Sequence, residues 1–233
     1  MFYLLSSIFF AALPLNSVKY VDYGSFPTLK NVRYGTQIDE LYDLGYCGFK
    51  WAPELSSFFL MLKDKYELNL CIETGTFKGD STIVFSRIFD RVDTIEINPS
   101  FLDFTKSKIG NRKNINFHLG NSVEVFKTLL PTLNKFRPIF YLDAHWNDFW
   151  PLRDELTLIG QNFKDNCIIV IDDFKVPNRP DITFDQYGKN ECSMEYIKDN
   201  LPEVYSSYEL IFLIPKSTSS KAKAVLIPTA WVK

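Results

Sequence analysis

The sequence has few of the residues that bind structural metals or form disulfides. Its 233 residues include two histidines and four cysteines, and the cysteines, Cys47, Cys71, Cys167 and Cys192, lie far apart with no C-x-x-C pair. Structural zinc sites need closely spaced Cys and His ligands, so none is expected. Cys71 and Cys167 fall in apolar runs, which favours buried thiols in a reducing compartment over a disulfide.

The chain also lacks an excess of positive charge and a long hydrophobic run. Its net charge is −2, so we expect no nucleic-acid-binding surface. The apolar stretch Met1–Leu15 is too short to span a membrane, and it has no basic residue before Lys19 to begin a signal peptide. We expect a cytoplasmic protein in which Met1–Leu15 packs as a helix on the domain or on a second copy in a homo-oligomer. A signal, a membrane anchor or a wrongly assigned start is the alternative.

What the sequence does contain, from residue 53 onward, is an alternation of apolar strand-like runs and helix-like stretches. The expected strands are Leu68–Glu73, Val92–Ile97, Ile115–Leu119, Pro138–Asp143, Cys167–Ile171, Tyr208–Ile214 and Ala224–Val232. This alternation predicts an α/β domain at 53–233, with a Rossmann-like, doubly wound, mostly parallel seven-stranded sheet. A short polar loop joins the last two strands, which predicts a C-terminal antiparallel hairpin. Residues 1–52 are expected to form a helical or cap extension.

The most informative stretch is Leu68–Thr82. An apolar strand ends in Glu73, a turn with Gly75 and Gly79 follows, and Asp80–Thr82 offers side chains that begin a helix. Backbone N–H groups of such a turn face a ligand, and a glycine allows close approach. The spacing is E-x-G-x-x-x-G and not the G-x-G-x-x-G of dinucleotide binders, so a nicotinamide oxidoreductase is the weakest alternative.

Polar side chains follow the ends of the expected parallel strands, which meet at one edge of a sheet. Glu96 ends the second strand, where a carboxylate can accept hydrogen bonds from both hydroxyls of a ribose. Gly120–Ser122 follow the third strand, Asp143–Trp146 the fourth and Asp172–Asp173 the fifth. We therefore expect these side chains to line one shared crevice.

The motifs Glu73–Gly79 (E-T-G-T-F-K-G), Glu96 and Gly120–Ser122 resemble the cofactor motifs of class I S-adenosylmethionine-dependent methyltransferases. The resemblance covers about residues 53–233, and it implies S-adenosylmethionine as the cofactor. The strand-two acid would hold the ribose, and the residues after strand three would lie near the adenine. The cofactor-binding residues it implies are Glu73, Thr74, Gly75, Thr76, Phe77, Gly79, Ser81, Thr82, Glu96, Asn121, Ser122 and Asp143. The family often has Asp where Asn121 stands, but an amide oxygen can still accept a bond from the adenine amino group.

In the second half, Tyr141–His145 and Ile171–Phe174 resemble the metal-dependent sugar O-methyltransferases of the macrocin type. This resemblance implies a divalent cation, expected to be Mg²⁺, and a sugar, glycan or other small-molecule acceptor. The metal ligands it implies are Asp143, Asp172 and Asp173. Converging carboxylates repel each other, and a hard cation relieves that repulsion. A metal-bound hydroxyl is more acidic, so Asp143 or His145 would remove its proton while the oxygen attacks a methyl group held in line.

Two further alternatives remain open. One is a metal-independent methyltransferase acting on nitrogen or on a small phenol, and the other is a non-catalytic binding module of the same fold. His118 alternates within its strand and is expected to be structural. The aromatic residues of Trp146–Trp150 would stack on a sugar or pack in the core. Arg153–Glu155 are expected to be solvated, and so is Asp185, for which contact with the acceptor is the alternative.

Overall fold

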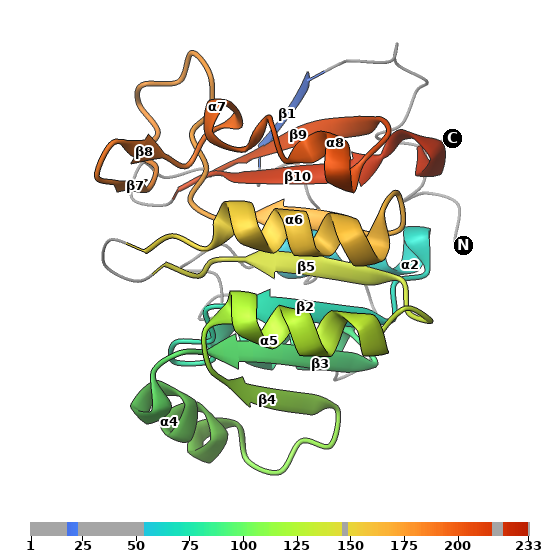
Figure 1. The fold of residues 1–233 in the computed structure, drawn as a ribbon, viewed down its shortest axis with the longest axis vertical. Helices are drawn as coiled ribbons and strands as arrows, with labels where there is room; N and C mark the ends of the chain where they lie inside the picture. The colour runs from blue at the N-terminus through green and yellow to red at the C-terminus, as the bar shows by residue number, and fades with distance from the viewer. Residues whose placement is uncertain (1–17, 23–53, 146–148, 216–220, 233) are drawn as a thin grey trace.

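The structure is a computed structural model that describes residues 18–22, 54–145, 149–215 and 221–232. These residues form an eight-stranded sheet in the order β1-β9-β10-β6-β5-β2-β3-β4 (Figure 1). The strands are β1 (Val18–Asp22), β2 (Leu70–Thr74), β3 (Arg91–Glu96), β4 (Ile115–Leu119), β5 (Pro138–Leu142), β6 (Ile168–Ile171), β9 (Tyr208–Ile214) and β10 (Lys223–Pro228). Among these described strands only β10 is antiparallel to its neighbours, β6 and β9. The predicted α/β class and mostly parallel sheet are confirmed.

The predicted count of seven strands is wrong, because Val18–Asp22 adds strand β1. The sequence places this segment in the helical or cap extension, whereas it pairs in parallel with β9 and covers that strand's edge. Lys19 Nζ lies 3.3 Å from Glu209 Oε2, and Tyr20 stacks on Phe212 with ring centroids 5.6 Å apart. The rest of the predicted extension, including Met1–Leu15, lies outside the described residues.

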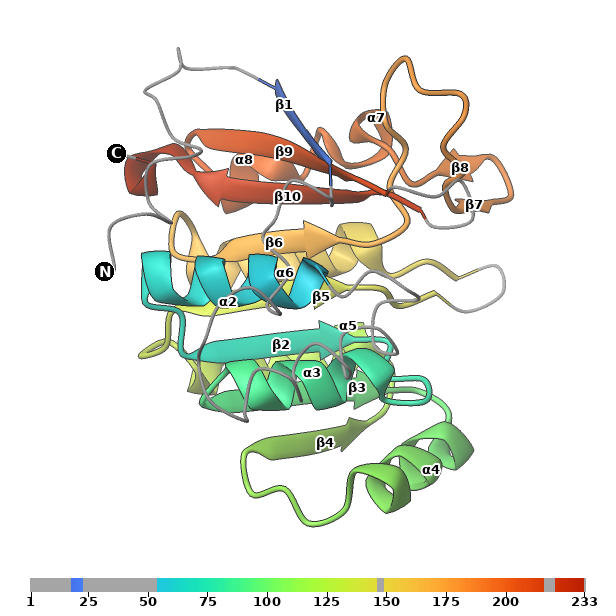
Figure 2. The ribbon, with the colours of Figure 1, turned by 180° about the vertical axis from the view of Figure 1, so that it is seen from behind.

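Helices cover both faces of the sheet, and each face has its own apolar core. The helices seen in front in Figure 2 are α2 (Glu54–Tyr66) and α3 (Asp80–Ile88). Those on the face seen in Figure 1 are α5 (Ser122–Leu129), α6 (Leu152–Phe163) and α8 (Leu201–Val204). Cys71 belongs to the first core and its neighbour Ile72 to the second, and Tyr141 and Phe140 divide in the same way. This division follows from the two-residue period of a strand.

Asparagine side chains begin two of the helices. Asn98 Oδ1 accepts a hydrogen bond from the Ser100 N–H at 2.9 Å, and Pro99 follows it at the start of α4 (Pro99–Ile109). Asn121 Oδ1 accepts one from the Val123 N–H at 2.9 Å at the start of α5. Both helices therefore start directly after the strand ends at which ligand-binding residues are expected.

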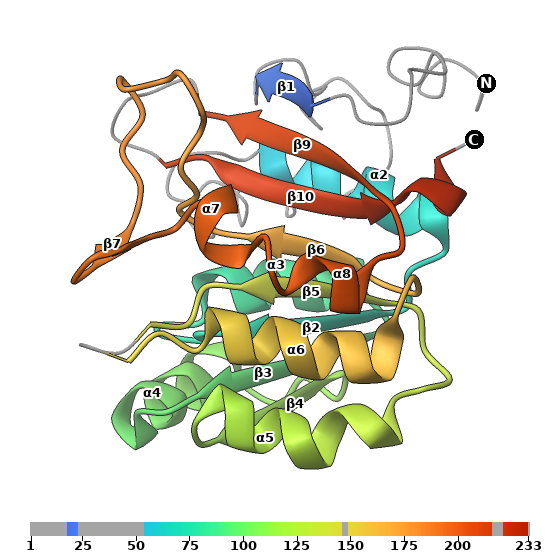
Figure 3. The same cartoon turned by 45° about the horizontal axis from the view of Figure 1, so that its top comes forward.

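The parallel strands end at a single edge, where their arrowheads point in Figure 1. From β2 the chain runs outward to β3 and β4 and then returns to β5 on the other side of β2, so the β2–β5 boundary is the topological switch point. The antiparallel β10 begins at the same edge. A separate hairpin of β7 (Gln186–Tyr187) and β8 (Asn190–Glu191) lies on the same side of the molecule as this edge (Figure 3). The short helix α7 (Met194–Ile197) follows the hairpin in the chain.

The structure also bears on two expectations from the sequence, that the cysteines are buried thiols and that no segment spans a membrane. Within the described residues, Cys71, Cys167 and Cys192 are buried thiols outside any disulfide, and Cys47 lies outside that part of the chain. Among the described helices, none combines the length and apolar character that crossing a bilayer requires.

Candidate functional site

The acid that ends β2, Glu73, is buried and braces the turn that follows it. Its carboxylate accepts hydrogen bonds from Thr82 Oγ1 at 2.5 Å, from Thr94 Oγ1 at 2.7 Å and from the Ser81 hydroxyl. Burial raises the pKa of Glu73 to about 7, although these three bonds act in the opposite direction. The structure thus brings the predicted residues Glu73, Ser81 and Thr82 together, with their side chains bonded to one another in support of the turn.

Two glycines let this turn approach its neighbours closely. Gly75 has φ +87°, and a Cβ atom there would lie 2.6 Å from the carbonyl oxygen of Asp143 in the loop after β5. Gly79 has φ +72°, and a Cβ atom there would collide with the methyl group of Thr105. Only glycine combines these conformations with such close contact. The turn after β2 therefore packs directly on the loop after β5 at the switch point.

Glu96 connects the end of β3 to the same turn. Its Oε2 accepts a hydrogen bond from the Phe77 N–H at 2.7 Å, and its Oε1 accepts one from the Asn98 N–H at 2.8 Å. The predicted ribose-binding acid thus lies against the glycine turn, as its proposed role requires. Phe77 has φ +47° and a half-exposed ring, which meets Phe101 edge to face at 4.6 Å. An aromatic surface therefore stands beside the turn.

The remaining residues predicted around the cofactor include Thr74 at the end of β2, Thr76 just after it, and Asn121 and Ser122 after β4. Thr76 is buried and its hydroxyl shares a hydrogen bond with Thr94 at 2.6 Å. Ser122 is buried beside Asn121, whose side chain caps α5. Thr74 is also buried, and its hydroxyl has no hydrogen-bond partner within the described part of the chain.

A pocket lies between the ends of β5 and β6, and we call it the β5–β6 pocket. Its cavity volume is about 20 Å³, room for a water molecule or for one polar group of a ligand. The carboxyl and imidazole side chains that line it are Asp143, His145, Glu155, Asp172, Asp173 and Asp185. The predicted catalytic and metal-binding residues therefore share one pocket.

Glu155, in the first turn of α6, presents a buried carboxyl group to this pocket. Its exposure is 1%, and although the Ser122 and Thr74 hydroxyls lie near its carboxyl group, no described residue makes a hydrogen bond of normal geometry to either carboxyl oxygen. Burial raises its pKa to about 7, while the nearby Ser122 and Thr74 hydroxyls act in the opposite direction. Buried polar groups are nearly always hydrogen-bonded, so a ligand that donates an N–H or O–H would satisfy this one. The expectation that Glu155 is solvated is wrong.

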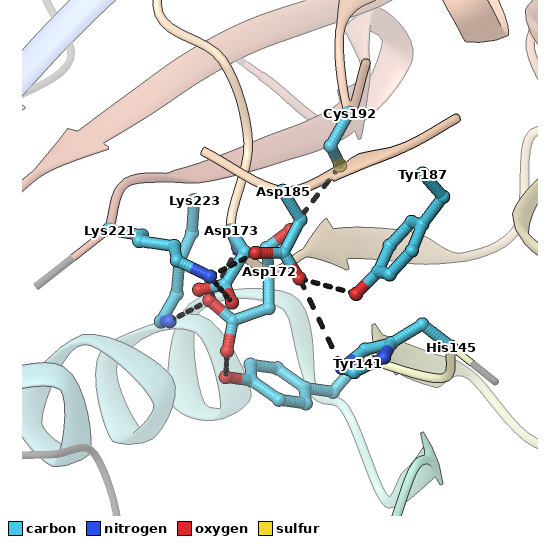
Figure 4. A network of polar contacts seen from close by, with 9 residues as sticks. All are labelled: Tyr141, His145, Asp172, Asp173, Asp185, Tyr187, Cys192, Lys221 and Lys223. Carbon is cyan, nitrogen blue, oxygen red and sulfur yellow. Dashed lines mark hydrogen bonds and ion pairs between the residues drawn. The ribbon is translucent and has the colours of Figure 1, made fainter. Parts of the chain in front are cut away.

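Two lysines at the start of β10 pair with three of the pocket carboxylates (Figure 4). Lys223 forms an ion pair with Asp172. Lys221 Nζ lies 2.7 Å from Asp173 Oδ2, and it also forms an ion pair with Asp185. Asp185 is thus part of a mostly buried network and not the solvated loop residue that the sequence suggests.

These contacts set the proton affinities of the network. Burial alone would raise the pKa of Asp172, but the charge and hydrogen bond of Lys223 hold it below its ordinary value. Burial and the Asp172 charge raise the pKa of Asp173 to about 6, although Lys223 and Lys221 act to lower it. Burial alone would lower the pKa of Lys221, but hydrogen bonds to its two carboxylate partners raise it. Lys221 is therefore an ammonium group at neutral pH.

The donor set does not fit the predicted magnesium site. Within the described residues, no three His, Cys, Asp or Glu side chains converge as metal ligands. An Mg²⁺–oxygen distance of about 2.1 Å and an ammonium–oxygen distance of about 2.8 Å would leave Mg²⁺ roughly 4 Å from the Lys223 ammonium, and the two cations would repel by about 8 kcal/mol at an effective dielectric constant of about 20. Asp143, Asp172 and Asp173 thus share the pocket without forming the expected metal-binding arrangement.

His145 stands on the other side of the pocket and is held by the β7–β8 hairpin. Its ring stacks on Tyr187 with centroids 5.0 Å apart, and its Nε2 lies 4.0 Å from Asp185 Oδ2. The Tyr187 hydroxyl donates a hydrogen bond to the same oxygen at 2.7 Å. The His145 side chain is 46% exposed. A half-exposed imidazole whose ring is held by stacking and lies near a carboxylate is a candidate general base.

The other histidine and the aromatic residues have different positions. His118 Nε2 lies 2.8 Å from the buried Asp93, which agrees with the structural role expected of it. Trp150 lines the pocket and stacks on Tyr196 with centroids 4.5 Å apart. Phe149 is exposed, and Trp146 lies outside the described residues.

Solved structures with the same architecture include three methyltransferases. TomG, an O-methyltransferase from Streptomyces achromogenes in complex with SAM, aligns with TM-score 0.53 and 17% identity over 84% of this chain and 91% of its own. PaMTH1 from Podospora anserina, bound to SAH, aligns with TM-score 0.54 and 13% identity over 85% and 91%. A Bacillus cereus O-methyltransferase in complex with SAH aligns with TM-score 0.52 and 14% identity over 88% and 99%.

The chain has the fold of class I methyltransferases. No protein-family model matches the sequence, and a search of curated proteins finds no match. At these identities the structural similarity establishes the methyltransferase fold, and any activity must be argued from the site itself.

Proposed function

We propose that this protein transfers a methyl group from S-adenosylmethionine to a hydroxyl oxygen of a sugar or glycan. The observation that carries the proposal is the contact between Gly75 and Asp143, because it joins the turn that we expect to hold the cofactor to an acid-lined pocket at the switch point. A cofactor on the turn would therefore lie next to an acceptor in the β5–β6 pocket. The bound SAM or SAH of the three similar structures supports this choice of cofactor.

The residues present fit this cofactor. The Gly75 turn leaves no room for a side chain, Glu96 lies against it, and the Phe77 ring is half exposed beside it. Asn121 stands at the end of β4, where an adenine would lie. S-adenosylmethionine would supply a methyl group on a positively charged sulfur. The part of the protein is to hold the acceptor oxygen in line with that methyl group.

The pocket has two candidates for removing the acceptor proton. As the oxygen–carbon bond forms and the carbon–sulfur bond breaks, the hydroxyl proton passes to His145 or to Asp143. His145 is oriented by Asp185 and Tyr187, whereas Asp143 belongs to the loop that contacts Gly75. The products are the methyl ether, a neutral thioether and one proton, so the reaction needs no covalent enzyme intermediate.

The lining of the pocket favours an acceptor with several hydroxyl groups. Carboxylates and the unpartnered Glu155 can accept several hydrogen bonds from a sugar, and the Trp150 and Tyr187 rings offer apolar surface. The same negative lining would attract a cationic amine, which makes nitrogen methylation the second candidate. Magnesium assistance is left out of the proposal, because Lys221 and Lys223 pair with its expected ligands.

The proposal is tested by calorimetric titration of the full chain with S-adenosylmethionine and S-adenosylhomocysteine, followed by transfer of labelled methyl groups to panels of glycans, phenols and amines. We expect binding of both ligands and labelling of hydroxyl acceptors. Binding of neither ligand would refute the proposal. Binding without transfer to any panel would indicate a non-catalytic module, and labelling of amines alone would select the second candidate.

A further inference from the structure

We propose that Lys221 and Lys223 take the place of a divalent cation in the β5–β6 pocket, so that methyl transfer by this protein needs no metal ion. The statement about transfer rests on the function proposed above. The statement about the pocket rests only on the arrangement of charges, and it can be tested without cofactor or acceptor.

The two ammonium groups supply the same total charge as one Mg²⁺. They lie against the carboxylates that would otherwise bind the ion, with Lys223 on Asp172 and Lys221 between Asp173 and Asp185. Solvent screens the Lys223–Asp172 contact little, because these side chains are 8% and 11% exposed, and it screens the contacts of Lys221, which is 29% exposed, more. The repulsion that a metal would relieve among these three acids is therefore already relieved by the chain itself.

The backbone holds both lysines opposite the acids. Lys223 pairs with Leu213 in the β9–β10 ladder. Between the two lysines, the Ala222 carbonyl accepts a hydrogen bond at 2.8 Å from the N–H of Phe174, which directly follows the Asp172–Asp173 pair. The segment that carries the ammonium groups is thus bonded on both sides. Leaving the pocket to a metal ion would require these side chains to abandon buried partners.

The substitution changes what the pocket can do to an acceptor. A bound metal ion would make an attached hydroxyl more acidic, whereas the two ammonium groups are engaged by carboxylates. The Tyr141 hydroxyl also donates a hydrogen bond to Asp172, which fixes that carboxylate further. Proton removal therefore depends on His145 or Asp143, while the two lysines offset part of the negative charge of the pocket and hold Asp172, Asp173 and Asp185 in place.

The test is a titration of the full chain with Mn²⁺ in the absence of cofactor and acceptor. Electron paramagnetic resonance measures how many Mn²⁺ ions each chain binds. The proteins compared are the wild type, K221M/K223M and the control K127M/K198M. The control loses the same charge from two exposed ion pairs, those with Glu124 and Glu195. We expect the wild type and the control to hold no stoichiometric ion up to about 1 mM, the weak end of carboxylate sites. K221M/K223M should bind one Mn²⁺ on the order of tenfold more tightly, and adding Asp172→Asn should remove it.

Two outcomes would overturn the proposal. One is a wild-type chain that binds one Mn²⁺ below roughly 100 µM and loses it in Asp172→Asn. The other is a K221M/K223M protein with a wild-type circular dichroism spectrum that gains no ion. If K221M/K223M does not fold, the comparison of the wild type with Asp172→Asn decides. The Mn²⁺ titration contains no S-adenosylmethionine. Its outcome therefore stands even if the proposed methyl transfer is refuted, and the proposed methyl transfer stands even if the pocket proves to bind a metal ion.

Discussion

The carbonyl oxygen of Asp143 occupies the space where a side chain of Gly75 would begin, 2.6 Å from an ideal Cβ position. The turn after β2 and the loop after β5 are therefore in direct contact. Under the proposed function, any change that separates them would move the cofactor away from the β5–β6 pocket. Binding of the cofactor and access to the acceptor should thus fail together when this contact is broken.

Gly75→Ala tests this contact. We expect a loss of about 1–3 kcal/mol in the free energy of unfolding, because the residue has φ +87° and its Cβ collides with backbone. S-adenosylmethionine affinity should fall on the order of tenfold or more, measured by calorimetry. Gly110→Ala is the control, since it has φ +70° with nothing within 4 Å in the described part of the chain. Equal loss of affinity in both variants would show that the approach to Asp143 is unimportant.

Glu96→Gln tests the acid at the end of β3. The two carboxylate oxygens accept hydrogen bonds from the N–H groups of Phe77 and Asn98, and an amide would set one N–H against another. We expect a loss of about 1–3 kcal/mol in stability and on the order of tenfold in S-adenosylmethionine affinity. Urea unfolding and calorimetry measure these, with Glu124→Gln on the exposed side of α5 as the control. Unchanged affinity would separate Glu96 from the cofactor site.

Glu155 makes the stability of the protein depend on pH. The folded side chain keeps its proton up to about pH 7, whereas the unfolded one releases it near pH 4.5. Its contribution is therefore fully present below about pH 4.5 and is lost as the pH rises through about 7. Glu155→Gln stays neutral, so at pH 8 it should exceed the wild type in unfolding free energy by roughly 1–3 kcal/mol.

Urea unfolding at pH 5 and pH 8 measures this difference, which should shrink at the lower pH. Glu203→Gln, on the exposed side of α8, serves as the control and should show no such trend. Glu73 has a similarly raised pKa, but every protein compared contains it, so its contribution cancels in the difference of unfolding free energies. A Glu155→Gln variant that is less stable than the wild type at pH 8 would contradict the prediction.

His145→Ala and Asp143→Asn separate the two candidate bases. If His145 removes the proton, its variant should lose on the order of 100-fold in kcat, keep the S-adenosylmethionine affinity and lose the acidic limb of the pH–rate profile. Asp143→Asn should then cost less in kcat. His118→Ala, which changes the histidine paired with Asp93, should retain kcat. Wild-type kcat in His145→Ala would assign the role to Asp143.

Much of the site could be predicted because parallel strands bring their carboxyl ends to one edge. Glu73, Gly75 and Glu96 each follow a recognisable apolar run, so their proximity needs only the rule for strand ends. The same rule brings Asp143 and Asp172 into one pocket. Their partners were not predictable in this way, because ion pairing depends on segments far away in the sequence.

The lysines show why. Lys221 and Lys223 precede or begin a strand, and residues there lie at the far edge of a parallel sheet. They reach the pocket because β10 is antiparallel and inserted between β6 and β9, which a hairpin prediction does not specify. Strand β1 was hidden for a related reason, since five residues pair with a strand near the other end of the chain.

Glu155 did leave a signal in the sequence. Leu152, Leu156 and Ile159 recur at helical spacing and are buried, and Glu155 falls on the same side of α6. An acid close to a helix start suggests solvation and a favourable dipole interaction, and that interpretation overrode the periodicity. A charged residue on an apolar helix face therefore indicates a pocket more reliably than its position near the helix start indicates solvent.

The pairing of β1 with β9 has a consequence for how the molecule is made. A ribosome releases Val18–Asp22 long before it has synthesised Tyr208–Ile214, so this segment has no hydrogen-bonding partner until β9 has been made. Its docking then closes the outer margin of the sheet against the strand that sits beside the lysine-bearing β10.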